Sequence, residues 1–340
     1  MILSLLGLMP GAFAQGLLWA VMAIGVYITY RILDIADLTA EGCFTLGAAV
    51  TCKLVTLGWD PFTSTIVSFL AGLLAGLVTG LLHTKLKIPA LLSGILTMTA
   101  LWSVNLRVMG QSNIPLLKQT TIISLLEDVG LTKNLAAIVA GLVLTVFVIF
   151  ILWIFFNTEL GFSLRATGDN KNMIRAQGVN TDNTLIFGIM LGNGLIAVSS
   201  SLVAQFNGFA DISMGTGTIV IGLASVIIGE VVFGHRNLLH SLIAVALGSI
   251  LYRIIIALVL WLGLSSNDLK LISSVLLAIA LCFPAIRNIF TKNLKNSIKK
   301  GGPAGGQRAA QLHRPHRHHD GAPGAALRAD LRRPADHALL

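Results

Sequence analysis

The stretch "RATGDNKNMIRAQGVN", residues 165–180, is a polar segment in a chain that is otherwise close to continuous membrane sequence. It carries two arginines, one lysine and one aspartate, and with its flanks it extends over residues 157–182. Hydrophobic runs long enough to cross a bilayer lie on both sides of it. Most other loops are short, so this segment is unusual, and the predicted spans on either side of it determine on which side of the membrane it lies.

The composition is that of a membrane protein. Of 340 residues, 55% are hydrophobic and only 11% are charged, whereas a soluble domain is about a quarter charged. Apolar runs of roughly 18 or more residues recur, and at about 1.5 Å per residue each can cross a bilayer as a helix. We predict an all-α polytopic membrane protein with about nine transmembrane helices. The predicted spans are 13–31, 38–57, 62–83, 89–109, 135–156, 184–206, 212–233, 238–261 and 269–286.

Lysine and arginine in the loops predict the orientation, because positive charge gathers in cytoplasmic loops. With the N-terminus outside, twelve such residues fall in cytoplasmic segments and five in outside segments. The cytoplasmic ones are Arg31, Lys85, Lys87, Arg165, Lys171, Arg175, Arg236, Arg287, Lys292, Lys295, Lys299 and Lys300, and the outside ones are Lys53, Arg107, Lys118, Lys133 and Lys270. The C-terminus and the segment 157–182 are then cytoplasmic. Topology explains most of the net charge of +9, so no nucleic-acid partner is expected.

Two short segments echo each other. "ADLTAEGCFTLGAA", beginning at Ala36, resembles "ADISMGTGTIVIGLA", beginning at Ala210. The matched pairs are Asp37 with Asp211, Thr39 with Ser213, Gly42 with Gly217 and Gly47 with Gly222. In the predicted topology the two copies enter the membrane from opposite sides, so they would form an inverted repeat of the kind found in transporters. Chance similarity between short, low-complexity segments is the alternative.

Small and polar residues within the spans suggest a translocation path. Glycine lets helices pack closely, and it also lets a helix break where it lines a water-filled cavity. Both segments of the echo are rich in small residues, which predicts broken or re-entrant helices, with ordinary close packing as the alternative. Polar side chains facing lipid would be costly, so they should face the interior or another helix. The candidate path residues are Glu41, Gly42, Gly47, Asn105, Asn193, Gly217 and Gly222.

The sequence contains no recognisable catalytic or nucleotide-binding motif. It contains no GxxxxGK[ST] motif to cradle nucleotide phosphates, no HExxH, no GxSxG and no cluster of carboxylates within the membrane. We therefore expect no catalytic residue, no metal site and no cofactor bound by this chain. Energy for active transport must come from elsewhere.

The segment 165–180 itself is predicted to form a short amphipathic helix. Leu164, Met173, Ile174 and Val179 supply an apolar side, and the charged residues supply a polar side. Such a helix, held between two spans, is suited to dock in a groove on a soluble partner and to pass its movement to the spans. A solvated or membrane-surface loop is the alternative.

The segment "LGFSLRATGDNKNMIRAQGVNTDNTLIFGIMLGNGLIAVSSSLVA" resembles the signature region of permease subunits of binding-protein-dependent ABC importers of the branched-chain amino acid and ribose type. "GLASVIIGEVVFG" resembles that family's last conserved membrane segment, and the resemblance covers about residues 10–290. It implies that the polar loop is the coupling segment that contacts the ATPase. With Asp169 and Arg175 from the polar side, the candidate coupling residues are Gly161, Arg165, Ala166, Gly168, Asp169, Asn170, Arg175, Ala176, Gly178 and Asn180.

The resemblance implies a permease subunit in a bacterial inner membrane, translocating a small solute that an external binding protein delivers. The implied partners are a second, identical permease subunit, two ATP-binding subunits and that binding protein, and ATP is bound by the ATPase subunits. The most similar subgroup accompanies lipoprotein-type binding proteins and includes members associated with aromatic amino acids. We expect an aromatic amino acid first, then a branched-chain amino acid, another small metabolite or a sugar. The alternative is an ion-gradient-driven secondary transporter, which would not need the segment 163–180.

Composition divides the chain into three parts. Residues 1–290 form the predicted transmembrane permease domain, with the coupling loop at 157–182. Residues 291–300 form a basic cytoplasmic end. Residues 301–340 contain many Gly, Pro, Ala, Arg and His but no Lys, Ile, Val or Phe, so they are predicted to be a disordered tail. The abrupt change in composition leads to the hypothesis that this tail arises from a shifted reading frame.

Overall fold

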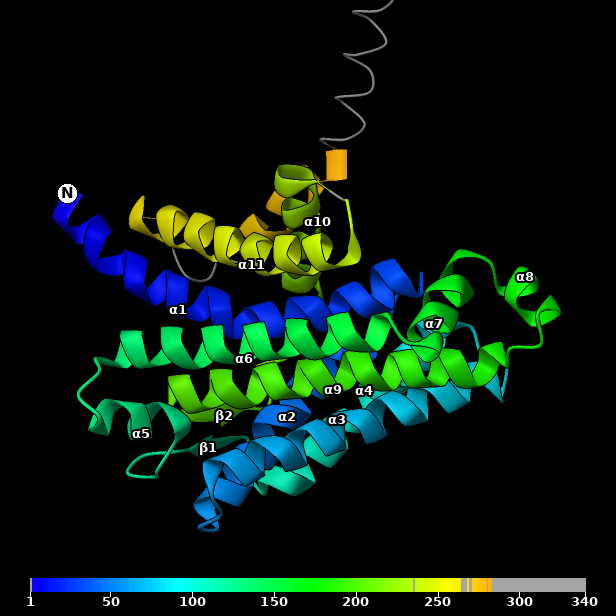
Figure 1. The fold of residues 1–340 in the computed structure, drawn as a ribbon. Coiled ribbons are helices and arrows are strands. Elements are labelled where there is room, and N and C mark those ends of the chain that lie inside the picture. Colours follow the sequence, from blue (N-terminus) through cyan, green and yellow to red (C-terminus); the bar gives the residue numbers. More distant parts are fainter. Residues whose placement is uncertain (1, 235, 264–267, 269–270, 280, 283–340) are drawn as a thin grey trace, which may run out of the picture. The chain divides into compact units, whose positions relative to one another are not determined.

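The computed structural model describes residues 2–234, 236–263, 268, 271–279 and 281–282 (Figure 1). Of the last predicted span, 269–286, only part lies in these ranges, and its residues 271–279 are helical. The predicted basic end, 291–300, and the predicted tail, 301–340, lie outside the described residues. The division of the chain into these parts therefore stays a prediction.

The described residues form helices and one two-stranded sheet. In the first half these are α1 (Ile2–Tyr27), the π-helix η1 (Ile28–Ile32), α2 (Thr39–Thr56), α3 (Pro61–Thr84), α4 (Ala90–Met109), β1 (Asn113–Pro115) and α5 (Ile122–Asp128). In the second half they are α6 (Lys133–Phe156), α7 (Glu159–Asp169), α8 (Lys171–Ala176), α9 (Thr181–Asn207), β2 (Phe209–Asp211), α10 (Thr218–Phe233) and α11 (Leu238–Trp261). The all-α class predicted from the sequence is confirmed.

Six helices within the described residues are long and apolar enough to cross a membrane: α1 with η1, α3, α4, α6, α9 and α11. The predicted spans 38–57 and 212–233 are not among these six: α2 has 18 residues but is less apolar and includes Glu41 and Lys53, and α10 has only 16 residues. The structure thus supports a multi-pass membrane protein, and the count of nine stays a prediction.

Two helices form the centre of the described fold. In α1 with η1, and in α9, 83% of the residues in the most apolar stretch are buried, compared with 28% to 44% in the other four long helices. Helix α9 packs against α1, α2 and α3. The outer helices instead show rows of large apolar side chains at their surface, such as Leu70 and Leu74 of α3. This pattern fits helices that have lipid on one side.

Local capping residues explain where several helices begin and end. The Asp60 carboxylate accepts hydrogen bonds from the backbone N–H groups of Phe62 and Thr63, and Pro61 occupies the first turn of α3. Helices α4 and α9 end at Gly110 and Gly208, both at positive φ, where glycine carries no steric penalty. Each of these glycines leads into one strand of the β1–β2 sheet, which is antiparallel.

The chain breaks inside the fold between η1 and α2. Residues 33–38 are not helical, and Leu33, Ile35 and Asp37 among them are buried. Asp37 lies next to the end of this stretch, and its carboxylate lies beside Asn193, near the middle of α9. Helix α2 therefore starts part-way along α9 rather than at its end, and Figure 1 shows its label within the bundle. This stretch falls at the connection between the predicted spans 13–31 and 38–57, and the predicted broken helices and inverted repeat stay predictions.

We predict that Gly76→Ala loosens the contact between α3 and α9. A Cβ atom there would lie 2.7 Å from the carbonyl oxygen of Ile189 and 2.7 Å from the Cα of Met190. Overpacking of this kind costs about 1–3 kcal/mol, so thermal unfolding in detergent should occur several degrees lower. Gly11→Ala is the matched control, because a Cβ at Gly11 meets nothing within 4 Å. Equal melting temperatures for the two variants would contradict the packing described.

Candidate functional site

The polar segment between α6 and α9 folds as two short helices, not as the single helix predicted over 165–180. Helix α7 ends at Asp169, and Asn170 then adopts an extended conformation, with φ of −155° and ψ of 95°. The Asn170 side chain accepts hydrogen bonds from the backbone N–H groups of Asn172 and Met173, and so caps α8. The single-helix prediction was wrong because a side chain that caps a new helix favours a break over continuation.

Helix α7 is firmly packed on the ends of three membrane helices. Leu164 is 1% exposed and belongs to the core cluster that contains Ile32, Phe156 and Leu185. Those residues come from the end of η1, the end of α6 and the start of α9. A displacement of α7 would therefore be felt by all three, since closely packed interiors transmit strain.

Two of the predicted coupling glycines make this packing possible. A Cβ atom at Gly168 would collide with the carbonyl oxygen of Ile32, and one at Gly161 would collide with the backbone of Phe155 and Phe156. Both positions therefore require the absence of a side chain. The glycines act here as contact points between α7 and the spans.

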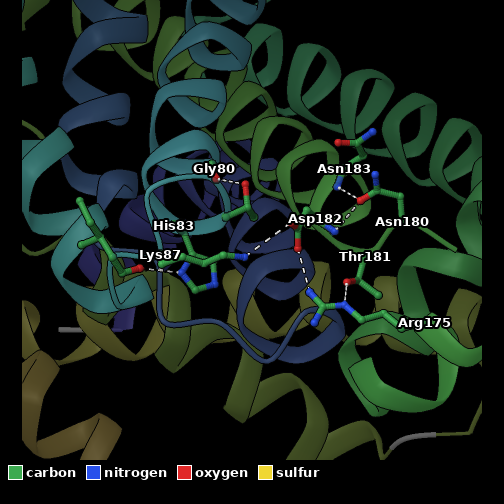
Figure 2. A network of polar contacts seen from close by, with 10 residues as sticks. Gly80, His83, Lys87, Arg175, Asn180, Thr181, Asp182 and Asn183 are labelled. Carbon is green, nitrogen blue, oxygen red and sulfur yellow. Dashed lines mark hydrogen bonds and ion pairs between the residues drawn. The ribbon is translucent and has the colours of Figure 1, made fainter.

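Helix α8 is tied to the start of α9 by a charged network (Figure 2). The Arg175 guanidinium donates to the Asp182 carboxylate at 2.9 Å and to the Thr181 hydroxyl at 2.6 Å. Lys87, in the connection between α3 and α4, lies 3.7 Å from the other Asp182 oxygen. Asn180 caps α9 by accepting from the N–H groups of Asp182 and Asn183. The network thus joins α8, α9 and the α3–α4 connection.

The outer surface of the segment is open. Arg165, Asp169 and Asn170 are exposed, as is Met173, which is 48% exposed. Ala166 is half-buried, Ala176 is exposed, and Gly178 forms the turn after α8 at φ +88°. In Figure 1, α7 and α8 lie at one end of α6 and α5 lies at the other. The surface could therefore receive a partner on one side of a membrane only.

Three of the predicted path residues line one cavity. The cavity has a volume of about 420 Å³ and includes Glu41, Gly42 and Asn105 among its lining residues. The other lining residues are Thr45, Met98, Thr99, Trp102, Ile212, Gly215 and Thr216. The walls thus come from α2, from α4 and from the irregular segment before α10. They combine one carboxylate, several hydroxyls, an amide and one large aromatic ring.

Hydrogen bonds hold the irregular segment against α2. The Gly217 backbone N–H donates to the Glu41 carboxylate at 3.0 Å, and the Gly215 N–H donates to the Thr45 hydroxyl at 3.0 Å. Gly217 has φ of +85° and precedes the first turn of α10. The Asn105 amide donates to the Gly42 carbonyl at 3.1 Å. Glu41 and Gly217, from the two halves of the echo, are therefore direct neighbours.

The remaining predicted path residues lie away from this cavity. Gly47 packs on α9, where a Cβ would collide with Ala197 and Ser200, and Gly222 packs on Val26 of α1. Asn193 is fully buried and donates to the Asp37 carboxylate at 2.6 Å. These three residues serve contacts between elements, which is the alternative that the sequence left open for glycines and asparagines.

The two aspartates of the echo make the same local turn. Asp37 accepts from the Thr39 N–H at 2.9 Å, and Asp211 accepts from the Ser213 N–H at 2.8 Å. Asp211 lies in β2, where hydrogen bonds from Ser213 hold the pKa of its carboxyl below its usual range. The turn is a shared local structure, although it does not establish the direction of the two copies.

Sequence reasoning missed several residues of these sites. Met98 and Trp102 lie seven and three residues before Asn105, so all three share one face of α4, and that spacing could have identified them. The pairing of Lys87 with Asp182 joins residues far apart in the chain. No local pattern indicates such a pair.

Comparison with known proteins gives a family match over most of the chain. Residues 9–282 match the family described as "Branched-chain amino acid transport system / permease component". A tyrosine transport system permease protein of Clostridioides difficile is 42% identical over 286 residues, covering 84% of this chain and 92% of that protein. An uncharacterized protein of Rickettsia prowazekii is 34% identical over 274 residues, covering 79% and 95%.

A more distant relative is the autoinducer 2 import system permease protein LsrC of Yersinia pseudotuberculosis. It is 24% identical over 223 residues, which cover 64% of this chain and 61% of that protein. No solved structure gives a significant match.

We predict that Asp182→Asn loosens α8 with little effect on the rest of the fold. The change weakens the pairs with Arg175 and Lys87, and exposed pairs of this kind contribute up to about 1 kcal/mol. Hydrogen exchange of residues 171–180 should speed up about threefold to fivefold. Asp169→Asn is the control, because Asp169 forms no ion pair within the part of the chain that the structure describes. Unchanged exchange in α8 of the Asp182 variant would count against the network.

Proposed function

The chain belongs to the family of branched-chain amino acid transport system permease components, and from this premise we propose that it carries an amino acid inward across the bacterial inner membrane, driven by a separate ATPase. As the permease component of an ABC-type system, it is a transport protein and not an enzyme. In the proposed orientation the N-terminus is outside and the segment 157–182 is cytoplasmic.

The observation that carries this proposal is the seating of α7. Its inner face packs on the ends of η1, α6 and α9, while its outer face and α8 are open. A partner that grips the outer face can therefore move three membrane helices at once. We assign this role to residues 163–180 and the partner to a P-loop ATPase, because this chain has no nucleotide-binding motif.

In this mechanism two permease subunits, proposed to be identical, each present one coupling segment to one of two ATPase subunits. Closure of the ATPases on ATP moves the two segments together. Because α7 is packed on the spans, the motion becomes rigid-body rocking of the helices. A binding protein on the outer side delivers the substrate to the cavity between the subunits.

The cavity beside α2 and α4 is the proposed part of the path. It holds the Glu41 carboxylate, the Asn105 side chain and the indole of Trp102, which is 48% exposed. The exposed ring leaves one side of the cavity to be closed by another surface, for which we propose the second permease subunit. The proposed inverted repeat would bring α2 and α10 to this path from opposite sides of the membrane.

The substrate is proposed to be an amino acid, with tyrosine first. A carboxylate can accept a hydrogen bond from an α-ammonium group, and an indole ring can pack on an aromatic side chain. The relative with 42% identity is named a tyrosine transport permease. The selectivity of import would still be set mainly by the binding protein.

The direct test is uptake of labelled tyrosine by proteoliposomes that contain this chain, the ATPase and the binding protein. We expect uptake only when ATP is present on the ATPase side and the binding protein on the other side. Unlabelled phenylalanine should compete better than ribose. Uptake driven by an ion gradient without nucleotide would contradict the proposal and favour a secondary transporter.

Gly168→Val should separate ATP hydrolysis from transport. The added side chain would collide with the Ile32 carbonyl and displace α7 from the spans. In the assembled transporter we expect hydrolysis to remain while uptake falls at least about tenfold, a loss equal to about 1.4 kcal/mol of coupling. Gly11→Val is the control, since its position has no neighbour within 4 Å. A Gly168 variant with normal uptake would remove α7 from the mechanism.

A further inference from the structure

A second and larger cavity lies beside α7, at the ends of η1 and α6 and the start of α11. Its volume is about 760 Å³, and neither the proposed path nor the charged network uses it. The polar part of its lining includes Arg31, Arg165, Arg236, Asp169 and Asn157. Three arginines from three separate elements therefore meet around one space.

The charge of this cavity is unbalanced. Arg31 is paired with Glu230 at 3.1 Å. Arg165 and Arg236 form no ion pair with any residue in the described ranges, and Asp169 is the one carboxylate in the lining. Guanidinium groups bind phosphate, like carboxylate, with paired hydrogen bonds. The cavity thus has the charge and donors for a phosphate group.

The lining is mainly polar and also includes Asn237, but it contains several large apolar side chains as well. Trp153 near the end of α6 is 42% exposed, and Leu239 at the start of α11 is 39% exposed. Tryptophan is enriched where a protein meets the membrane–water interface. Cations and large apolar groups in one lining match a molecule that carries both an anionic head and hydrocarbon.

We propose that this cavity binds the phosphate headgroup of an anionic phospholipid, with Arg165 and Arg236 on the phosphate and Trp153 and Leu239 against the start of an acyl chain. Basic pockets between transmembrane helices are known to bind such headgroups. Inorganic phosphate has the same anionic chemistry, but it makes no contact with the apolar side chains of the lining. The proposal does not depend on transport, so it can fail or succeed separately from the proposed function.

The three arginines of the cavity come from different elements of the fold. Arg165 belongs to α7, whereas Arg31 and Arg236 belong to η1 and to the connection before α11. A bound headgroup would hold these elements together by bridging their charges. If α7 couples to an ATPase as proposed above, the lipid would adjust the coupling.

The test uses the purified full chain in detergent with equal amounts of phosphatidylglycerol and phosphatidylcholine of identical acyl chains. Native mass spectrometry should find about one more phosphatidylglycerol than phosphatidylcholine retained per chain. Arg236→Gln should reduce that retention at least about fivefold, whereas Arg236→Lys, which keeps the charge, should retain most of it. Lys85→Gln is the matched control, because it removes a positive charge from the same predicted side but does not line the cavity.

Each outcome of this experiment either supports or overturns the proposal. Equal retention of the two lipids by the unaltered chain, or unchanged retention in Arg236→Gln, would overturn the proposal. Displacement of phosphatidylglycerol by millimolar inorganic phosphate would assign the site to free phosphate and overturn the proposal of a lipid ligand. Persistence of the lipid in phosphate would support it. The comparison of lipids in the unaltered chain needs no variant, so misfolding of Arg236→Gln would not remove the test.

Discussion

The buried hydrogen bonds of Asp37 are the constraint on which the rest of the structure depends. A non-helical stretch within a membrane protein leaves backbone groups that need partners, since lipid offers none. Asp37 is 4% exposed, accepts from Asn193 at 2.6 Å and from the Thr39 N–H at 2.9 Å, and so fixes the end of that stretch on α9. Helix α2 can then begin part-way along α9, which is where its first turn meets the segment before α10.

The cavity follows from that placement. With α2 starting where it does, Glu41 in its first turn reaches the Gly217 N–H, and Gly42 faces Asn105 of α4. Had α1 continued as one long helix into α2, this carboxylate would lie elsewhere. Ile32, the last residue of η1 before the break, also makes the contact with Gly168. One break in the chain therefore lies beside both the proposed coupling segment and the proposed path.

Much of this could be predicted from the sequence, and the part that could not has a physical reason. Long apolar runs give helices almost directly, and capping residues such as Asp60 and Asn180 stand at their starts. The polar segment was located, but its division at Asn170 was missed, because periodicity alone does not separate one helix from two. Glu41, Gly42 and Asn105 were three of the seven residues predicted for the path, and they line one cavity. In the sequence, Gly47 and Gly222 look the same as Gly42. They differ from it only in which helix each of them contacts in the fold.

Pairs far apart in the chain were beyond sequence reasoning. Asp37 with Asn193, Lys87 with Asp182 and the three arginines beside α7 are brought together only by the packed fold. Such pairs depend on how each helix is rotated about its axis and on how far along its neighbour it lies. A single sequence determines neither.

The central claim is that an ATPase holds the α7–α8 surface. The most direct measurement is photo-crosslinking from a benzophenone amino acid at position 173, in place of the exposed Met173 of α8, in cells that express the whole system. We predict one dominant adduct, with a P-loop ATPase subunit, and loss of that adduct when the probe stands instead at the buried position of Leu164. Adducts with the outer binding protein, or with lipid and other permease copies alone, would contradict the claim.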